Sequence, residues 1–204
     1  MARSTFIPYG RLPQHQIATV QIRLQAAGNS QPNKLSHTPG GKLFDQNAND
    51  GGADAKLPGS EYTPFTINRG RATGRLTGGN LSLLAALAGT PFQPSFAGKI
   101  VFIEDVGEQP YRIDRLFTQL LQATDLQQAA GIALGVFIDC AAKTPSYSLT
   151  LTATLQDRLG NLGIPVVYGL PFGHVPEQVT FPYGVLADFD AGGRRLTFLE
   201  AGVV

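Results

Sequence analysis

The stretch at residues 99–121, KIVFIEDVGEQPYRIDRLFTQLL, decides the fold class of this 204-residue chain. Residues 99–104 form a short apolar run that closes on an acidic residue, which predicts a buried strand. Pro110 suits the first turn of a helix because that position needs no N–H donor. Apolar side chains then recur with helical spacing, at Ile113, Leu116, Phe117, Leu120 and Leu121. A strand followed directly by an amphipathic helix predicts an α/β domain.

Similar patterns lie on both sides of this unit. Residues 71–76 predict a strand that ends at Gly78-Gly79. Asn80 suits the N-cap of a short helix that Gly89 stops. The apolar runs at 131–137 and 164–170 are typical of strands.

The segment between those two runs is ambiguous, and the chain ends on a hairpin pattern. Residues 149–159 fit a strand or a helix, and the glycines that follow favour the helix. Residues 185–189 and 195–199 flank a glycine-rich turn and predict a hairpin. We therefore expect a small α/β domain with a mixed sheet and flanking helices.

The N-terminal third has a different character. Residues 26–64 are rich in Gly, Asn, Pro, Asp and Lys and show no sustained period, which predicts irregular or disordered chain. Residues 17–24 alternate and fit either a short strand or a helix turn. We expect residues 1–66 to be an irregular N-terminal arm, an unrelated or truncated leader, and residues 67–204 to be the organised domain.

Composition argues against several classes of function. The net charge is +1 without a long basic run, so neither nucleic-acid nor membrane-surface binding has electrostatic support. The chain has no apolar run of membrane-spanning length and no signal core, so we expect a soluble cytoplasmic protein. Cys140 ends an apolar run and is expected to be a buried small hydrophobe rather than a nucleophile. No Cys/His cluster has metal-ligand spacing, so we expect no zinc site.

Two residues are candidates for chemistry. Glu104 closes an apolar strand, and sites in α/β domains gather at strand ends; the alternative is a surface carboxylate in an acidic loop. His174 follows a strand and a glycine and could act as a general base; the alternative is a solvated surface histidine. The sequence contains no G-x-S-x-G elbow, and none of its serines has the sequence context of a sharp strand-to-helix turn.

Four motifs resemble one family. GRLTGGNL at 74–81 resembles the G-x-L-x-G-G-N-L block of LD-carboxypeptidases, also called muramoyltetrapeptide carboxypeptidases. The stretches GTPF at 89–92, IVFIEDVGEQPYRIDR at 100–115, and IPV to PYG at 164–184 resemble further family motifs in the same order. The match covers roughly residues 69–200.

The resemblance implies a swivelling-type C-terminal α/β domain and a Ser-Glu-His triad. Glu104 and His174 would be the triad glutamate and histidine. The serine of these enzymes belongs to an N-terminal domain, in a G-x-S-D-x-T turn that this sequence lacks. We therefore expect little activity from the chain alone, and a partner that bears the serine.

The resemblance also implies a substrate, a cytoplasmic murein tetrapeptide cut before its terminal D-alanine, and a homodimer. It implies a mechanism that needs no metal and no organic cofactor. Related immunity peptidases cut peptidyl-nucleotide antibiotics, which leaves the substrate open. The alternative function is an inactive fragment or a binding module that keeps the C-terminal fold.

Overall fold

The computed structural model describes residues 21–23, 64–143, 147–175 and 182–202, with backbone alone for the first of these ranges. Residues 26–64, where irregular or disordered chain was predicted, lie outside the described residues except for Pro64. Of the segment at 17–24, where a strand or a helix turn was expected, residues 21–23 are described and form a strand.

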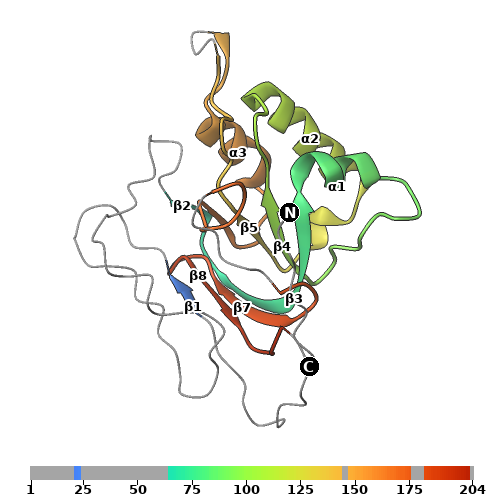
Figure 1. Ribbon diagram of the computed structural model, residues 1–204, viewed down its shortest axis with the longest axis vertical. Coiled ribbons are helices and arrows are strands. Elements are labelled where there is room, and N and C mark those ends of the chain that lie inside the picture. Colours follow the sequence, from blue (N-terminus) through green and yellow to red (C-terminus); the bar gives the residue numbers. More distant parts are fainter. Residues whose placement is uncertain (1–20, 24–63, 144–146, 176–181, 203–204) are drawn as a thin grey trace, which may run out of the picture.

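An eight-stranded mixed sheet organises the described residues, in the order β1-β8-β7-β3-β4-β5-β6-β2 (Figure 1). Its centre is parallel, from β3 through β4 and β5 to β6. The remaining strands pair antiparallel at both edges. The strands are β1 Gln21–Arg23, β2 Phe65–Asn68, β3 Arg71–Asn80, β4 Ile100–Glu104, β5 Gly131–Leu134, β6 Val166–Tyr168, β7 Leu186–Asp190 and β8 Arg195–Phe198.

Three α-helices of the described chain cover one side of this sheet (Figure 1). They are α1 Leu81–Leu87, α2 Pro110–Ala123 and α3 Leu151–Leu159, with a short 3-10 helix, η2, at Leu126–Gln128. The middle helix, α2, packs against both α1 and α3. The expected small α/β domain with a mixed sheet and flanking helices is therefore confirmed.

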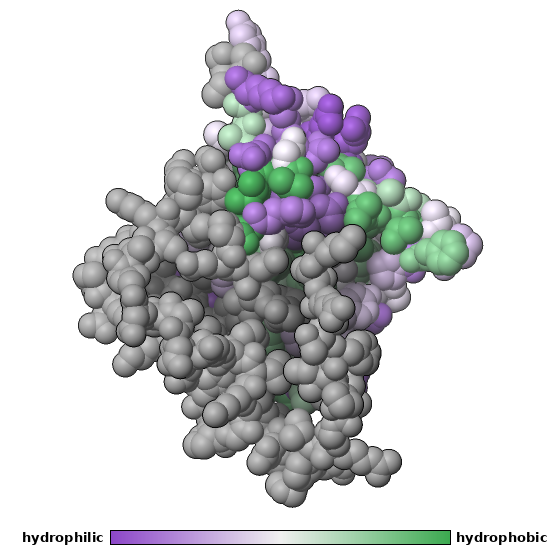
Figure 2. Space-filling view, viewed as in Figure 1, coloured by the Kyte–Doolittle hydropathy of each residue, from purple (hydrophilic) through white to green (hydrophobic). Residues whose placement is uncertain are grey.

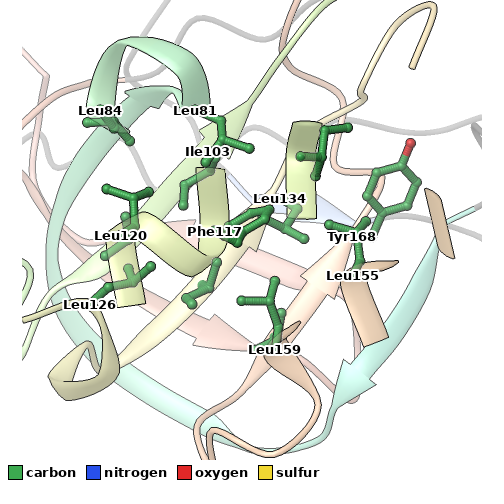
Figure 3. Close-up of a cluster of buried hydrophobic side chains, with 14 of the residues drawn as sticks. Leu81, Leu84, Ile103, Phe117, Leu120, Leu126, Leu134, Leu155, Leu159 and Tyr168 are labelled. Atoms are coloured by element: carbon green, nitrogen blue, oxygen red, sulfur yellow. The ribbon is translucent and has the colours of Figure 1, made fainter. Parts of the chain in front are cut away.

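The alternation of side chains along the strands gives the sheet two cores. Val101 and Ile103 face the helices, where they join a core with Phe117 of α2 (Figure 3). Ile100 faces the opposite side and joins a second core with Phe189 of β7. Both faces of the central strands are thus buried, as parallel sheets require.

The sheet curls along β3, which is ten residues long and lies between two different neighbours, β7 on one edge and β4 on the other. Its first half, from Arg71 to Arg75, pairs antiparallel with β7, and its second half, from Leu76 to Asn80, pairs parallel with β4. The hairpin β7–β8 then folds over the second core. A Cβ added at Gly131 of β5 would lie 2.8 Å from the Phe189 ring, so β7 closes directly on the centre of the sheet.

Most predicted elements are present, with three differences. The predicted β4, α1, α2 and β7–β8 hairpin are confirmed, and residues 149–159 take the helical alternative. The strand predicted for 71–76 does not stop at Gly78-Gly79 but runs to Asn80. Gly78 continues it because its bare Cα lets β3 approach β4, where an added Cβ would lie 1.8 Å from the Phe102 carbonyl oxygen. β5 and β6 are shorter than the apolar runs at 131–137 and 164–170 that predicted them, and β2 was not predicted.

The surface over α1 and α2 mixes hydrophilic and apolar residues (Figure 2). Leu83, Phe92 and Tyr111 are large apolar or aromatic side chains that stand more than half exposed, at 65%, 79% and 54%. No helix in the described part of the chain is long and apolar enough to cross a membrane.

Candidate functional site

The candidate site lies at the edge of the sheet where the parallel strands end. Glu104 is the last residue of β4, and the register of the parallel pair places Asn80, the last residue of β3, directly beside it. The Glu104 side chain is 13% exposed, so its carboxylate is largely shielded from solvent but still reaches the surface. This is the edge at which α/β sheets place their ligands.

His174 reaches the same edge from the segment after β6. The Val136 N–H donates to the Phe172 carbonyl (3.0 Å), and Val136 and Gly173 form a parallel bridge. Gly173 has a φ of 116°, and a Cβ there would lie 2.9 Å from the Val136 carbonyl oxygen and 3.3 Å from Glu104 Oε2. Glycine therefore lets the histidine segment lie directly against the Glu104 carboxylate.

Glu104 and His174 form a hydrogen bond across 70 residues of sequence. Nδ1 of His174 lies 2.9 Å from Oε2 of Glu104. An ionised carboxylate only accepts hydrogen bonds, so this contact selects the tautomer or charge state with a proton on Nδ1. In the neutral ring Nε2 is then the basic nitrogen, and the side chain is 56% exposed. The structure thus brings together the two residues singled out in the sequence.

A second carboxylate and an amide support this pair. The Nδ2 group of Asn80 donates to Glu104 Oε1 (3.3 Å) and to Asp105 Oδ1 (3.0 Å). Asp105 is only 2% exposed and also accepts hydrogen bonds from Ser82 and Val106. The sequence indicates that Asn80 caps a helix and that Asp105 lies in an acidic loop, but it does not indicate that the Asn80 amide joins Asp105 to Glu104. The contact follows from the register of β3 against β4, which cannot be derived from the sequence of either strand.

Cys140 is buried, as predicted. Its thiol donates to the Ile138 carbonyl oxygen (3.2 Å), and burial raises its pKa to about 12. A thiol with so high a pKa holds almost no thiolate at neutral pH, so Cys140 is a poor nucleophile. Within the described ranges, no group of three His, Cys, Asp or Glu side chains has the arrangement of a metal site.

The serines in the described ranges hydrogen-bond away from His174. Ser82 donates to Asp105, Ser95 donates to Asp125, and Ser148 donates to the Leu149 carbonyl. None of these three hydroxyls is hydrogen-bonded to the imidazole.

Comparisons with known proteins identify the family of this chain. A family profile described as the LD-carboxypeptidase C-terminal domain matches residues 73–189. A Synechocystis protein assigned as a carboxypeptidase is 47% identical over 146 residues, which cover 70% of this chain and 48% of the relative. The murein tetrapeptide carboxypeptidase of Pseudomonas aeruginosa is 39% identical over 127 residues, which cover 62% of this chain and 40% of that enzyme.

A solved structure extends the likeness to three dimensions. The crystal structure of muramoyltetrapeptide carboxypeptidase from Oxalobacter formigenes superposes with a TM-score of 0.59 at 34% identity, covering 66% of this chain and 48% of that one. The chain thus spans about half the length of the relatives it matches, or less. Since the family profile covers more than half of the sequence, the chain belongs to the LD-carboxypeptidase family, and its residues 73–189 correspond to the C-terminal domain of that family.

Proposed function

We propose that this chain contributes the glutamate and histidine of a serine-type LD-carboxypeptidase that acts on cytoplasmic murein tetrapeptide. The observation that carries the proposal is the 2.9 Å contact between His174 Nδ1 and Glu104 Oε2. It is the arrangement by which a carboxylate orients a general-base histidine. The choice of substrate rests on the relative from Pseudomonas aeruginosa, which is named a murein tetrapeptide carboxypeptidase.

The proposed chemistry follows from the tautomer. His174 Nε2 takes the proton of a serine hydroxyl, and the serine oxygen attacks the carbonyl carbon that precedes D-alanine. The Glu104 carboxylate accepts the Nδ1–H bond and stabilises the imidazolium that forms. His174 then returns its proton to the D-alanine nitrogen as the peptide bond breaks, and water hydrolyses the acyl-enzyme by the same proton transfers.

A serine-bearing domain is the proposed partner at this edge. The three described serines hydrogen-bond elsewhere, so the nucleophile comes from outside the described ranges. Leu83 and Val106 lie next to Asn80 and Asp105 in the site and are 65% and 37% exposed. A serine-bearing domain docked at this edge would cover both side chains and remove their apolar surface from water.

A chimera tests the proposal. The region of the Pseudomonas aeruginosa enzyme that matches this chain is replaced by this chain, and D-alanine release from murein tetrapeptide is measured by mass spectrometry. We expect release from the chimera and about a millionfold less from the chain alone, because removing a nucleophile costs about that much turnover.

Substitutions in the chimera then assign the residues. Glu104→Gln is expected to lower kcat by about 10⁴-fold, because the imidazole loses its orienting carboxylate. His174→Ala should be at least as damaging. Glu200→Gln is the matched control, since Glu200 pairs with Arg75 away from the site. A folded chimera that releases no D-alanine would favour the alternative, a binding module that keeps the fold.

A further inference from the structure

We propose that Asn80 is a positioning residue for the Glu104–His174 pair, and that the buried carboxylate of Asp105 holds Asn80 in place. Asn80 lies between the two carboxylates and donates to both of them. The geometric part of this inference stands on the contacts alone. Its consequence for turnover rests on the function proposed above.

The orientation of the Asn80 amide is determined by the helix that it caps. Its Oδ1 accepts the Leu83 N–H (3.1 Å) at the N-terminus of α1. That bond needs an oxygen, so the other end of the amide, facing Glu104 and Asp105, is the NH₂ group. Its two protons match the two carboxylate oxygens at 3.3 and 3.0 Å. A flipped amide would lose all three hydrogen bonds.

Asp105 prevents this amide from moving. Its Oδ2 accepts the backbone N–H of Ser82 (3.0 Å) and the Ser82 hydroxyl (2.8 Å). Its Oδ1 accepts the Val106 N–H (2.8 Å) together with the Asn80 amide. With four donors on a carboxylate that is 2% exposed, the group is fixed in the fold.

Glu104 is held at both oxygens as a result. Oε1 accepts from Asn80, and Oε2 faces His174. Without the Asn80 donor, the Glu104 carboxylate could turn about its last torsion, and no N–H would lie between it and the Asp105 carboxylate. Their mutual repulsion would then drive Glu104 away from the orientation that receives the His174 proton.

The tautomer of His174 reports this orientation without any need for catalysis. The experiment is ¹⁵N NMR of the imidazole in the full chain at a pH where the ring is neutral, with the signal assigned by His174→Gln. In the wild type we expect mainly the Nδ1–H form, because Glu104 accepts that proton. A histidine in water without such an acceptor favours Nε2–H.

The substitution Asn80→Ser removes the hydrogen-bond donor to Glu104 but keeps a side chain that can cap α1. Serine is as good an N-cap as asparagine, so α1 keeps its first hydrogen bond while Glu104 loses its partner. We expect His174 to change from mainly Nδ1–H to mainly Nε2–H. Asn80→Asp also keeps the cap but adds a third carboxylate, and it should shift the tautomer at least as far.

Ser95→Ala is the matched control. It removes the same kind of hydrogen bond, from a serine hydroxyl to Asp125 (2.8 Å), and should lower the melting temperature, but it touches neither Asn80 nor Asp105, so the tautomer should stay Nδ1–H. An unchanged tautomer in a folded Asn80→Ser or Asn80→Asp chain would overturn the proposal. A shifted tautomer in Ser95→Ala would do so as well, since a loss of stability unrelated to Asn80 would then produce the effect.

The chimera separates this inference from the proposed function. If both hold, Asn80→Ser lowers kcat by about 10²-fold with little change in KM, because a displaced base costs about that much. If the wild-type chimera releases no D-alanine, the proposed function fails. The tautomer measurement on the chain still decides whether Asn80 positions Glu104.

Discussion

Gly173 is the residue on which the approach of His174 to Glu104 depends. Gly173→Ala should cost about 1–3 kcal/mol, because alanine is strained at a φ of 116°. Its methyl group would also press on Val136 and Glu104, so the His174 tautomer should shift. Urea unfolding and the ¹⁵N spectrum measure the two effects.

Gly98 provides the control for Gly173. It also has a positive φ, 67°, but a Cβ there meets nothing within 4 Å. Gly98→Ala should lower stability by about 1–2 kcal/mol from backbone strain alone and leave the tautomer unchanged. Equal effects of the two substitutions on the tautomer would show that close packing at Gly173 does not matter.

Cys140 gives a prediction about pH. The thiol has an ordinary pKa of 9.0, and burial raises it to about 12 in the folded chain. As the pH rises, the Cys140 thiol therefore stays protonated to a higher pH in the folded state than in the unfolded state. Its contribution to stability is complete below about pH 9 and is lost as the pH rises toward 12, by about 1.4 kcal/mol per pH unit.

Cys140→Ala removes that dependence. The free energy of unfolding of the wild type relative to Cys140→Ala should fall steadily between pH 9 and 11. Urea unfolding of both proteins at several pH values measures this difference, in which other titrating groups cancel. A difference that does not vary with pH would mean that the thiol is not desolvated.

At the level of residues, the sequence predicts candidates better than contacts. Glu104 stood out because it ends a strand and His174 because it follows one, and the family resemblance assigned their roles. Nothing in composition or spacing indicates that they touch, since the pairing depends on strand order. Asn80 shows the same limit. Its role as a helix cap is local and can be predicted from the sequence, whereas its contact with Glu104 depends on the register of β3 against β4.

At the level of elements, the turn between β7 and β8 depends on Asp190. The Gly193 N–H donates to its carboxylate (2.8 Å), and Arg71 lies 2.9 Å away. The Gly193 hydrogen bond, assisted by the charges of Arg71 and Arg195, lowers the pKa of Asp190. Asp190→Asn should therefore cost about 1–3 kcal/mol at pH 7.

The effect of Asp190 should depend on pH in a defined direction. Because the pKa of Asp190 is lowered by folding, its carboxylate stabilises the fold at pH values above the ordinary aspartate pKa. This stabilisation is lost as the pH falls through the pKa that Asp190 has in the folded chain. The difference between wild type and Asp190→Asn should thus shrink below about pH 4. Asp188→Asn, in the same strand with an exposed hydrogen bond to Thr73, is the control and should cost less than about 0.5 kcal/mol at pH 7.

Helices and central strands could be predicted because their signals are local. The helical spacing of apolar residues in α2 and the apolar run of β4 each predict the element from a short stretch of sequence. The end of β3 could not be predicted, since two glycines usually mark a turn, and here Gly78 lets two backbones approach closely. β2 has only four half-buried residues, and what defines it is its pairing with β6.

At the level of the whole molecule, the two cores share the strands between them. Phe117 lies in the core under the helices and Phe189 in the core under the hairpin, and both are fully buried. Replacing either by alanine should cost about 3–5 kcal/mol. Because β4 contributes Ile103 to one core and Ile100 to the other, each variant should unfold in a single transition.

Two spectroscopic probes test this cooperativity. Far-ultraviolet circular dichroism follows the helices and strands together, and tyrosine fluorescence follows all six tyrosines, of which Tyr168 is buried in the helical core. The midpoints in urea should coincide for the wild type and for both variants. Separate midpoints in Phe189→Ala would mean that the hairpin core melts independently.

The two-sided pairing of β3 has a consequence for synthesis on the ribosome. The second half of β3 can pair with β4 soon after both have left the ribosome. Thr73 in the first half can pair only after Asp188 of β7 has been synthesised, 115 residues later. At roughly 5–20 residues per second, this leaves one edge of a nascent strand unpaired for on the order of ten seconds. Arg71, Thr73 and Arg75 place polar side chains along that edge, and such residues discourage nascent chains from joining one another there.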